Sequence, residues 1–129
     1  MDNLSIAQEW FAIANTDLAS ALFLQDMHPT PIEIICYHCQ QATEKYLKGF
    51  LAAKGETIQK THDLVWLNSA CRQYDEGFDA IEKNCLLLTD YGVAVRYPFP
   101  IDVNASDMEI ALRHAQQVKD FVLGKAGNF

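Results

Sequence analysis

Three short polar clusters in this 129-residue chain contain the residue types that bind phosphate. The first cluster is Glu44, Lys45 and Lys48. Taken alone it is explained more simply as a solvated helix face, because Glu44 and Lys48 form an i,i+4 pair. The two lysines nevertheless belong to the only locally basic part of the chain, since residues 1–30 contain neither Lys nor Arg. Any phosphate-bearing ligand is therefore expected beside Lys45 and Lys48.

The second cluster is Thr61-His62-Asp63-Leu64, which precedes a predicted short helix. Thr61 is expected to cap that helix, and the helix dipole favours Asp63 in its first turn. Neither role accounts for His62. A helix N-terminus beside a histidine and nearby lysines is suited to binding an anion.

The third cluster contains Tyr91, Arg96 and Tyr97, followed by a proline. An arginine at the end of an apolar helix can bind the last carbonyl groups, in which case the cluster only ends the helix. Alternatively, the arginine presents a planar guanidinium to phosphate or carboxylate, and a tyrosine stacks on a base. The sequence leaves both interpretations open.

Helical periodicity predicts the elements that position these clusters. Amphipathic helices are expected over residues 3–25, 34–54 and 78–95, with a shorter helix after Thr61 and a last helix from a Ser106-x-x-Glu109 capping box to Gly124. Thr30 is the expected cap of the central helix, and Gly55 its end. No stretch alternates as a strand does. The sequence therefore predicts an all-α, antiparallel up-and-down four-helix bundle with one short extra helix, as a single domain over residues 1–129.

The central helix carries a stripe of small and apolar residues at steps of three and four, expected to face the core (Ile35, Cys39, Ala42, Tyr46, Gly49 and Ala53). Cys36-x-x-Cys39 with His38 between them suggests zinc or redox chemistry. A structural zinc site needs two further ligands, and the sequence has no second such pair. Redox chemistry of the thioredoxin type would need a βαβ pattern. We therefore expect no metal, no cofactor, and Cys39 in the core.

Other catalytic arrangements are also weakly supported. The sequence has no glycine-rich phosphate loop, and its serines stand in helical or capping contexts. The net charge of −7 argues against a protein that grips long nucleic acid. No apolar run reaches the ~20 residues of a membrane-spanning helix, and no secretory signal is evident, so a cytoplasmic protein is expected.

The three clusters together resemble the HEPN domain family (higher eukaryotes and prokaryotes nucleotide-binding). The similar segments are HCQQATEKYLK from His38 to Lys48, THDL from Thr61 to Leu64, and RYP from Arg96 to Pro98. The resemblance implies a helical bundle and a homodimer, for which Tyr37, Leu47 and Leu51 are the candidate contacts. It also implies pairing with a minimal nucleotidyltransferase in a toxin–antitoxin-like system, or nucleotide binding.

The sequence departs from the family's ribonuclease motif, in which a histidine follows an arginine after four to six residues. Arg72, Arg96 and Arg113 have no histidine at that distance, and His114 directly follows Arg113. We therefore predict a nucleotide-binding module with no catalytic residue. Its expected ligand-binding residues are Lys45, Lys48 and Arg96 for phosphate, His62 for hydrogen bonding, and Tyr91 or Tyr97 for stacking or orientation, with Asp63 beside them in the same site. The alternatives are a metal-independent ribonuclease using His38, His62 or His114, and a purely structural dimer.

Overall fold

The computed structural model describes residues 2–94 and 102–126, which form helices and connecting segments with no strand among them. The elements are α1 (Asn3–Leu24), α2 (Ile32–Ala53), α3 (Leu64–Arg72), the 3-10 helix η1 (Glu76–Ile81), α4 (Glu82–Leu88), α5 (Tyr91–Ala94) and α6 (Ala105–Ala126). The prediction of an all-α bundle is confirmed. No helix in these ranges is long and apolar enough to cross a membrane.

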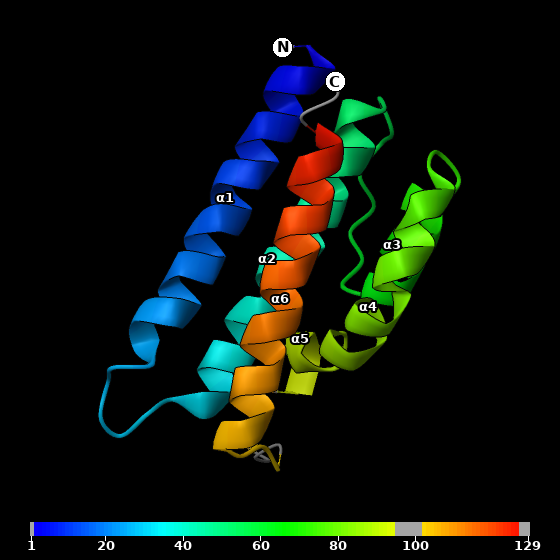
Figure 1. Ribbon diagram of the computed structural model, residues 1–129. Coiled ribbons are helices and arrows are strands. Elements are labelled where there is room, and N and C mark those ends of the chain that lie inside the picture. Colours follow the sequence, from blue (N-terminus) through cyan, green and yellow to red (C-terminus); the bar gives the residue numbers. More distant parts are fainter. Residues whose placement is uncertain (1, 95–101, 127–129) are drawn as a thin grey trace.

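Successive segments of the bundle alternate in direction (Figure 1). Helix α1 descends in that view and α2 returns beside it. The next descending pass is an extended segment, residues 56–63, rather than a helix. Consequently α3 ascends, in the same direction as α2. The next two elements, η1 and α4, descend, and α6 then ascends in front of α2. The extended segment thereby brings the start of α3 to the middle of α2.

Helix α2 is the centre of the bundle and packs against α1, α3, α4, α5 and α6. Its predicted stripe is confirmed, because Ile35, Cys39 and Tyr46 are fully buried. Helix α1 approaches closely at Gly49, where an added Cβ would lie 2.5 Å from Cε1 of Phe11. Glycine at this position therefore allows the two long helices to touch.

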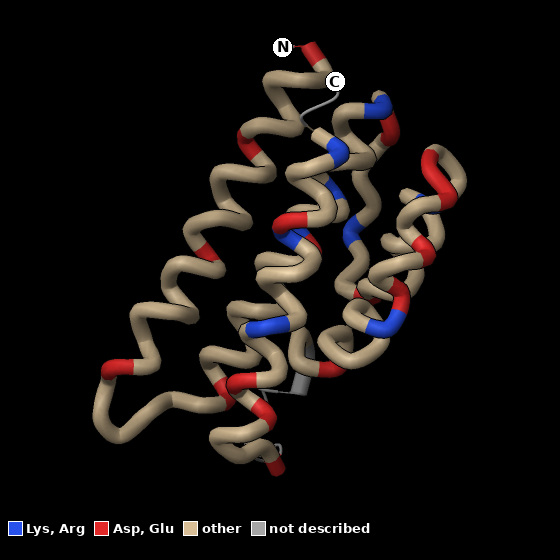
Figure 2. Tube along the Cα trace, in the orientation of Figure 1, with Lys and Arg blue, Asp and Glu red and all other residues tan. Residues whose placement is uncertain are grey.

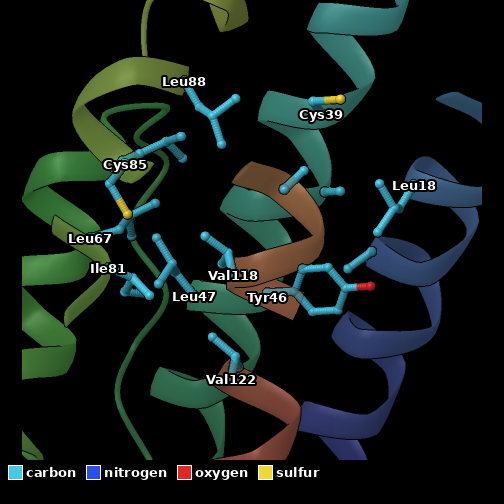
Figure 3. Close-up of a cluster of buried hydrophobic side chains, with 14 of the residues drawn as sticks. Leu18, Cys39, Tyr46, Leu47, Leu67, Ile81, Cys85, Leu88, Val118 and Val122 are labelled. Atoms are coloured by element: carbon cyan, nitrogen blue, oxygen red, sulfur yellow. The ribbon is translucent and has the colours of Figure 1, made fainter. Parts of the chain in front are cut away.

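Leu47 and Leu51 lie in the core rather than on a dimer surface. Leu47 is fully buried and Leu51 is 5% exposed. Figure 3 shows Leu47 in the same cluster as Leu67 of α3 and Ile81 of η1. The expectation that these two leucines form dimer contacts is wrong, because α3 and η1 cover the face of α2 that the sequence left without a partner.

Several helix ends differ from those predicted. Asp63, not Thr61, caps α3, because its Oδ1 accepts hydrogen bonds from the amides of Val65 (3.0 Å) and Trp66 (3.1 Å). Thr61 instead accepts from the amide of Asp63. No side-chain hydrogen bond caps α2, so the capping role predicted for Thr30 is also wrong.

The second half of the chain contains three further differences. Asn104 accepts from the amide of Asp107 and donates its own amide to that side chain, so this pair replaces the predicted Ser106 capping box. Helix α6 continues through Gly124 to Ala126. The helix predicted over residues 78–95 is divided into η1, α4 and α5. At Gly55 the prediction is confirmed, since its φ of 81° ends α2 in a left-handed conformation.

Candidate functional site

Five polar side chains of α2 are buried: Gln40, Gln41, Thr43, Glu44 and Lys48. Glu44 is 4% exposed and Lys48 is 6% exposed. Taking such groups out of water is costly unless each one finds a partner. Their contacts therefore decide what this part of the bundle can do.

Glu44 is the centre of the resulting network. Its Oε1 lies 2.8 Å from Nδ1 of His62 and accepts from the side-chain amide of Gln40 at 3.4 Å. Its Oε2 accepts from Nζ of Lys48 at 3.1 Å. The ammonium of Lys48 also lies over the ring of Trp10, 5.8 Å from the ring centre. Lys48 is thus an internal cation held by a carboxylate and an aromatic face.

Gln40 connects α2 to the segments that carry the other two sequence clusters. Its Nε2 donates to the main-chain oxygen of His62 at 3.0 Å, and its Oε1 accepts from Gln41 at 2.8 Å. On the other side, Gly92 of α5 lies so close that an added Cβ would be 2.6 Å from Cδ of Gln40. Sequence reasoning missed this residue. The available signals were its place in the HCQQATEKYLK segment that resembles the family and its position one helical turn before Glu44.

The network continues to α1 through Lys45. Nζ of Lys45 donates to Oδ2 of Asp17 at 2.8 Å and to Oε1 of Gln41 at 3.0 Å. His38 lies near the same carboxylate, but its Nδ1 is 3.6 Å from Asp17, which is beyond hydrogen-bonding distance. A chain of polar contacts therefore crosses α2 from Asp17 to Glu44 and His62.

His62 is the part of this network that faces solvent, with 55% of its side chain exposed. It lines a shallow pocket of about 300 Å³ with Asp63, Thr89 and Asp90. Thr89 accepts a hydrogen bond from the amide of Leu64 at 3.0 Å, which joins the end of α4 to the start of α3 at the pocket. With Nδ1 held by Glu44, Nε2 is the ring nitrogen of His62 that a ligand can reach.

Two carboxylates line the same pocket, and they affect the ligand it can take. The Asp63 carboxylate caps α3 and already accepts from main-chain amides. Asp90 adds a second negative charge. A phosphate group here requires a strong cation to offset both charges.

The described residues among the expected ligand-binding set are found in three environments: in ion pairs, in the lining of the pocket, and half-buried at the start of α5. Lys45 and Lys48 are paired with Asp17 and Glu44, whereas His62 and Asp63 line the pocket. Tyr91 is half-buried, and burial is the main cause that raises the pKa of its phenol. Tyr91 therefore remains a hydrogen-bond donor at neutral pH. Arg96 and Tyr97 lie outside the described residues.

The side chain of His114, the histidine next to Arg113, is partly buried and hydrogen-bonded to α4. The side-chain amide of Asn84 donates to Nδ1 of His114 at 2.8 Å and to Gln117 at 2.8 Å. Burial, and then the charge of Arg113, lower the pKa of His114. The ring is therefore neutral at physiological pH and accepts a hydrogen bond through Nδ1.

The four cysteines are buried thiols. Burial raises the pKa of Cys36 to about 11 and that of Cys85 to about 12. Cys39 is fully buried in the core, as predicted. Within residues 2–94 and 102–126, no group of three or more His, Cys, Asp or Glu side chains could hold a metal ion.

Comparison with known proteins is consistent with this architecture. The family model for the HEPN domain matches residues 7–125 of the chain. The chain belongs to the HEPN domain family. The resemblance inferred from the three sequence clusters is thereby confirmed.

Two solved structures show the same fold. TT1696 from Thermus thermophilus is 26% identical, with a TM-score of 0.78, and the similarity covers 92% of this chain and 97% of that one. ST0689, an archaeal HEPN homologue, is 21% identical, with a TM-score of 0.71, and the similarity covers 93% and 97% of the two chains. Among curated proteins there is no significant match in sequence.

Proposed function

We propose that this HEPN protein binds a nucleotide or another phosphate-bearing ligand where α2, the turn at His62 and the start of α5 meet. The observation that supports the proposal is the Glu44–His62 contact of 2.8 Å, which holds an exposed imidazole beside a pocket. Gln40 contacts both flanking segments and therefore fixes their separation. The His38–Lys48 and Thr61–Leu64 segments that led to the family thus meet through Gln40 and Glu44 of α2.

Each ligand contact follows from the chemistry of the side chain. Nε2 of His62 accepts from a hydroxyl or amino group when the ring is neutral, and donates to a phosphate oxygen when it is protonated. A phosphate beside Asp63 and Asp90 needs a cation, and we assign that role to Arg96 on the family resemblance of the Arg96–Pro98 segment. Tyr91 or Tyr97 orients the base by stacking or hydrogen bonding.

Lys45 and Lys48 have a different role in this proposal. Either lysine would have to leave a carboxylate to reach the ligand, and breaking a buried ion pair is costly. We therefore assign them the task of holding Asp17 and Glu44 in place. Asp63 contributes through the cap that sets the start of α3.

The proposed partner is a minimal nucleotidyltransferase, in a toxin–antitoxin-like system. The support is membership of the HEPN family, many small prokaryotic members of which resemble this chain in size and pair with such enzymes. Co-expression with a minimal nucleotidyltransferase from the same organism should give one species that co-elutes in size-exclusion chromatography. Separate elution of the two proteins would contradict the partnership.

Nucleotide binding is tested by isothermal titration calorimetry with ATP. Arg96→Ala should weaken binding at least tenfold, about 1.4 kcal/mol, because it removes the main cation of the site. Arg113→Ala is the matched control, since Arg113 is exposed on α6. His62→Ala should also weaken binding, whereas His28→Ala, which changes an exposed histidine between α1 and α2, should not. Equal affinities for the Arg96 and Arg113 variants would refute the proposed site.

One observation favours ribonuclease activity as a second candidate. A buried carboxylate bonded to one nitrogen of an exposed histidine leaves the other nitrogen available for proton transfer. If this pair is catalytic, RNA cleavage is lost in His62→Ala and retained in His114→Ala, because His114 is bonded to Asn84. Cleavage that survives in His62→Ala would remove this candidate.

A further inference from the structure

A second pocket, of about 370 Å³, lies between α3 and the segment that follows α2. It shares no lining residue with the His62 pocket. Trp66, Ala70 and Tyr74 line it at steps of four, the first two on one face of α3 and Tyr74 in the turn that follows the helix. Leu51 forms part of its apolar lining. We call it the Trp66 pocket.

Two aromatic side chains in the lining of the Trp66 pocket are open to solvent. Trp66 is 48% exposed and Tyr74 is 44% exposed. Exposed aromatic side chains that line a hollow are typical of binding surfaces, because they supply large contact areas with few rotatable bonds. Aromatic faces also attract cations, and arginine most often.

The charged group in the lining is a carboxylate. Glu56 accepts a hydrogen bond from the hydroxyl of Tyr74 through Oε1, which leaves Oε2 for another donor. A neighbouring open hollow of about 550 Å³ is lined by Glu76, Asp79 and Arg72, and Arg72 already donates to Asp79 at 3.2 Å. Figure 2 shows the acidic residues of this side on the turn before η1 and on η1, whereas the charged residue of α3 is Arg72. The negative charge of Glu56 and of the neighbouring carboxylates therefore complements a cationic occupant.

The extended segment beside the pocket offers main-chain groups as well. Residues 57–60 are neither helix nor strand, and they run alongside α3 (Figure 1). Within the described part of the chain, no main-chain hydrogen bond satisfies their N–H and C=O groups. Exposed, unpaired main chain next to a side-chain pocket is the arrangement that binds extended peptides.

We propose that the Trp66 pocket docks an extended segment of a partner protein, whose arginine side chain enters between Trp66 and Tyr74 and pairs with Glu56. The guanidinium stacks on the rings and donates to Oε2 of Glu56. The main chain on either side of that arginine pairs with residues 57–60. Arginine fits better than lysine, since its planar group both stacks on aromatic rings and donates several hydrogen bonds.

The fluorescence of Trp66 provides the test. Trp10→Phe removes the chain's other tryptophan, which packs against the core, so the remaining emission comes from Trp66. The probes are N-acetyl-arginine amide and N-acetyl-citrulline amide, which have nearly the same shape and differ in charge. We expect saturable quenching by the arginine compound at constant ionic strength, and at least tenfold weaker binding of the citrulline compound.

Matched variants locate the interaction. Glu56→Gln should weaken binding of the arginine compound about tenfold, whereas Glu76→Gln, the same change outside the pocket, should alter it less than twofold. Equal binding of arginine and citrulline, or equal effects of the two variants, would overturn the proposed cation site.

A longer probe tests for a polypeptide occupant. A blocked Val-Arg-Val tripeptide should bind at least fivefold more tightly than the single arginine compound, and methylation of its main-chain nitrogens should abolish that gain. A tripeptide that binds no better would overturn peptide docking. Sedimentation velocity of the Glu56→Gln variant provides a further check. A loss of self-association in this variant would identify the occupant as a second copy of the chain and would also overturn the proposal.

Discussion

Replacing Glu44 with glutamine should test whether the polar network of α2 holds the bundle together. The substitution keeps the shape of the side chain and removes its charge. Lys48, whose side chain is 7% exposed, is then left without a carboxylate, since Glu44 is its ion-pair partner at 3.1 Å. Breaking a buried pair from one side costs about 3–5 kcal/mol. Because the glutamine side chain can still accept a hydrogen bond from Lys48, we expect the free energy of unfolding to fall by about 3 kcal/mol, the lower end of that range.

Other ion pairs of the same chain provide a graded comparison. The Lys45–Asp17 pair is less buried, with side-chain exposures of 18% and 19%. Asp17→Asn should therefore lower the free energy of unfolding by about 1–2 kcal/mol, a value between those for breaking a buried ion pair and a surface ion pair. In the Arg72–Asp79 pair the carboxylate is 72% exposed. Asp79→Asn should change the free energy of unfolding by less than about 0.5 kcal/mol.

The assay is urea-induced unfolding at neutral pH, followed by far-UV circular dichroism. The double variant Glu44→Gln with Lys48→Met removes the stranded cation and should recover most of the loss. Similar unfolding free energies for Glu44→Gln and Asp79→Asn would refute the reasoning that burial sets the cost. A double variant as unstable as Glu44→Gln alone would refute the assignment of that cost to Lys48.

Three further predictions concern packing, thiols and pH. Gly49→Ala should lower the free energy of unfolding by about 1–3 kcal/mol in urea titrations, because its Cβ would meet the ring of Phe11 at 2.5 Å. The thiols of Cys36 and Cys85 should react with Ellman's reagent only after unfolding, since burial removes access and raises their pKa values to about 11 and about 12; rapid reaction of the native protein would contradict this. The folded state lowers the pKa of His114 below its ordinary 6.5, so the unfolded chain binds the proton more readily and stability is lost as pH falls below about 6.5. In urea titrations over this pH range, the free energy of unfolding should fall less with decreasing pH in His114→Gln than in the unaltered protein. Identical pH profiles would contradict the assignment of this pH dependence to His114.

The sequence was sufficient to predict the bundle because helical periodicity is a local property. The stripe through Ile35, Cys39 and Tyr46 appears at steps of three and four, and the structure buries all three. The end of α2 at Gly55 was equally local, since only glycine readily adopts a φ of 81°. The capping residues were less predictable. Asp63 and Thr61 are both good caps in sequence, and the backbone around α3 selects Asp63.

The sequence by itself determined that this is an all-helical protein with a polar face on its central helix. The tertiary structure decided what that face does. Glu44 meets His62 across 18 residues of sequence, and Lys45 meets Asp17 across 28. No local pattern specifies such partners, because they depend on how the extended segment and α1 pack against α2. For the same reason Lys48, which has the sequence features of a ligand-binding cation, is a buried partner of Glu44 in the folded protein.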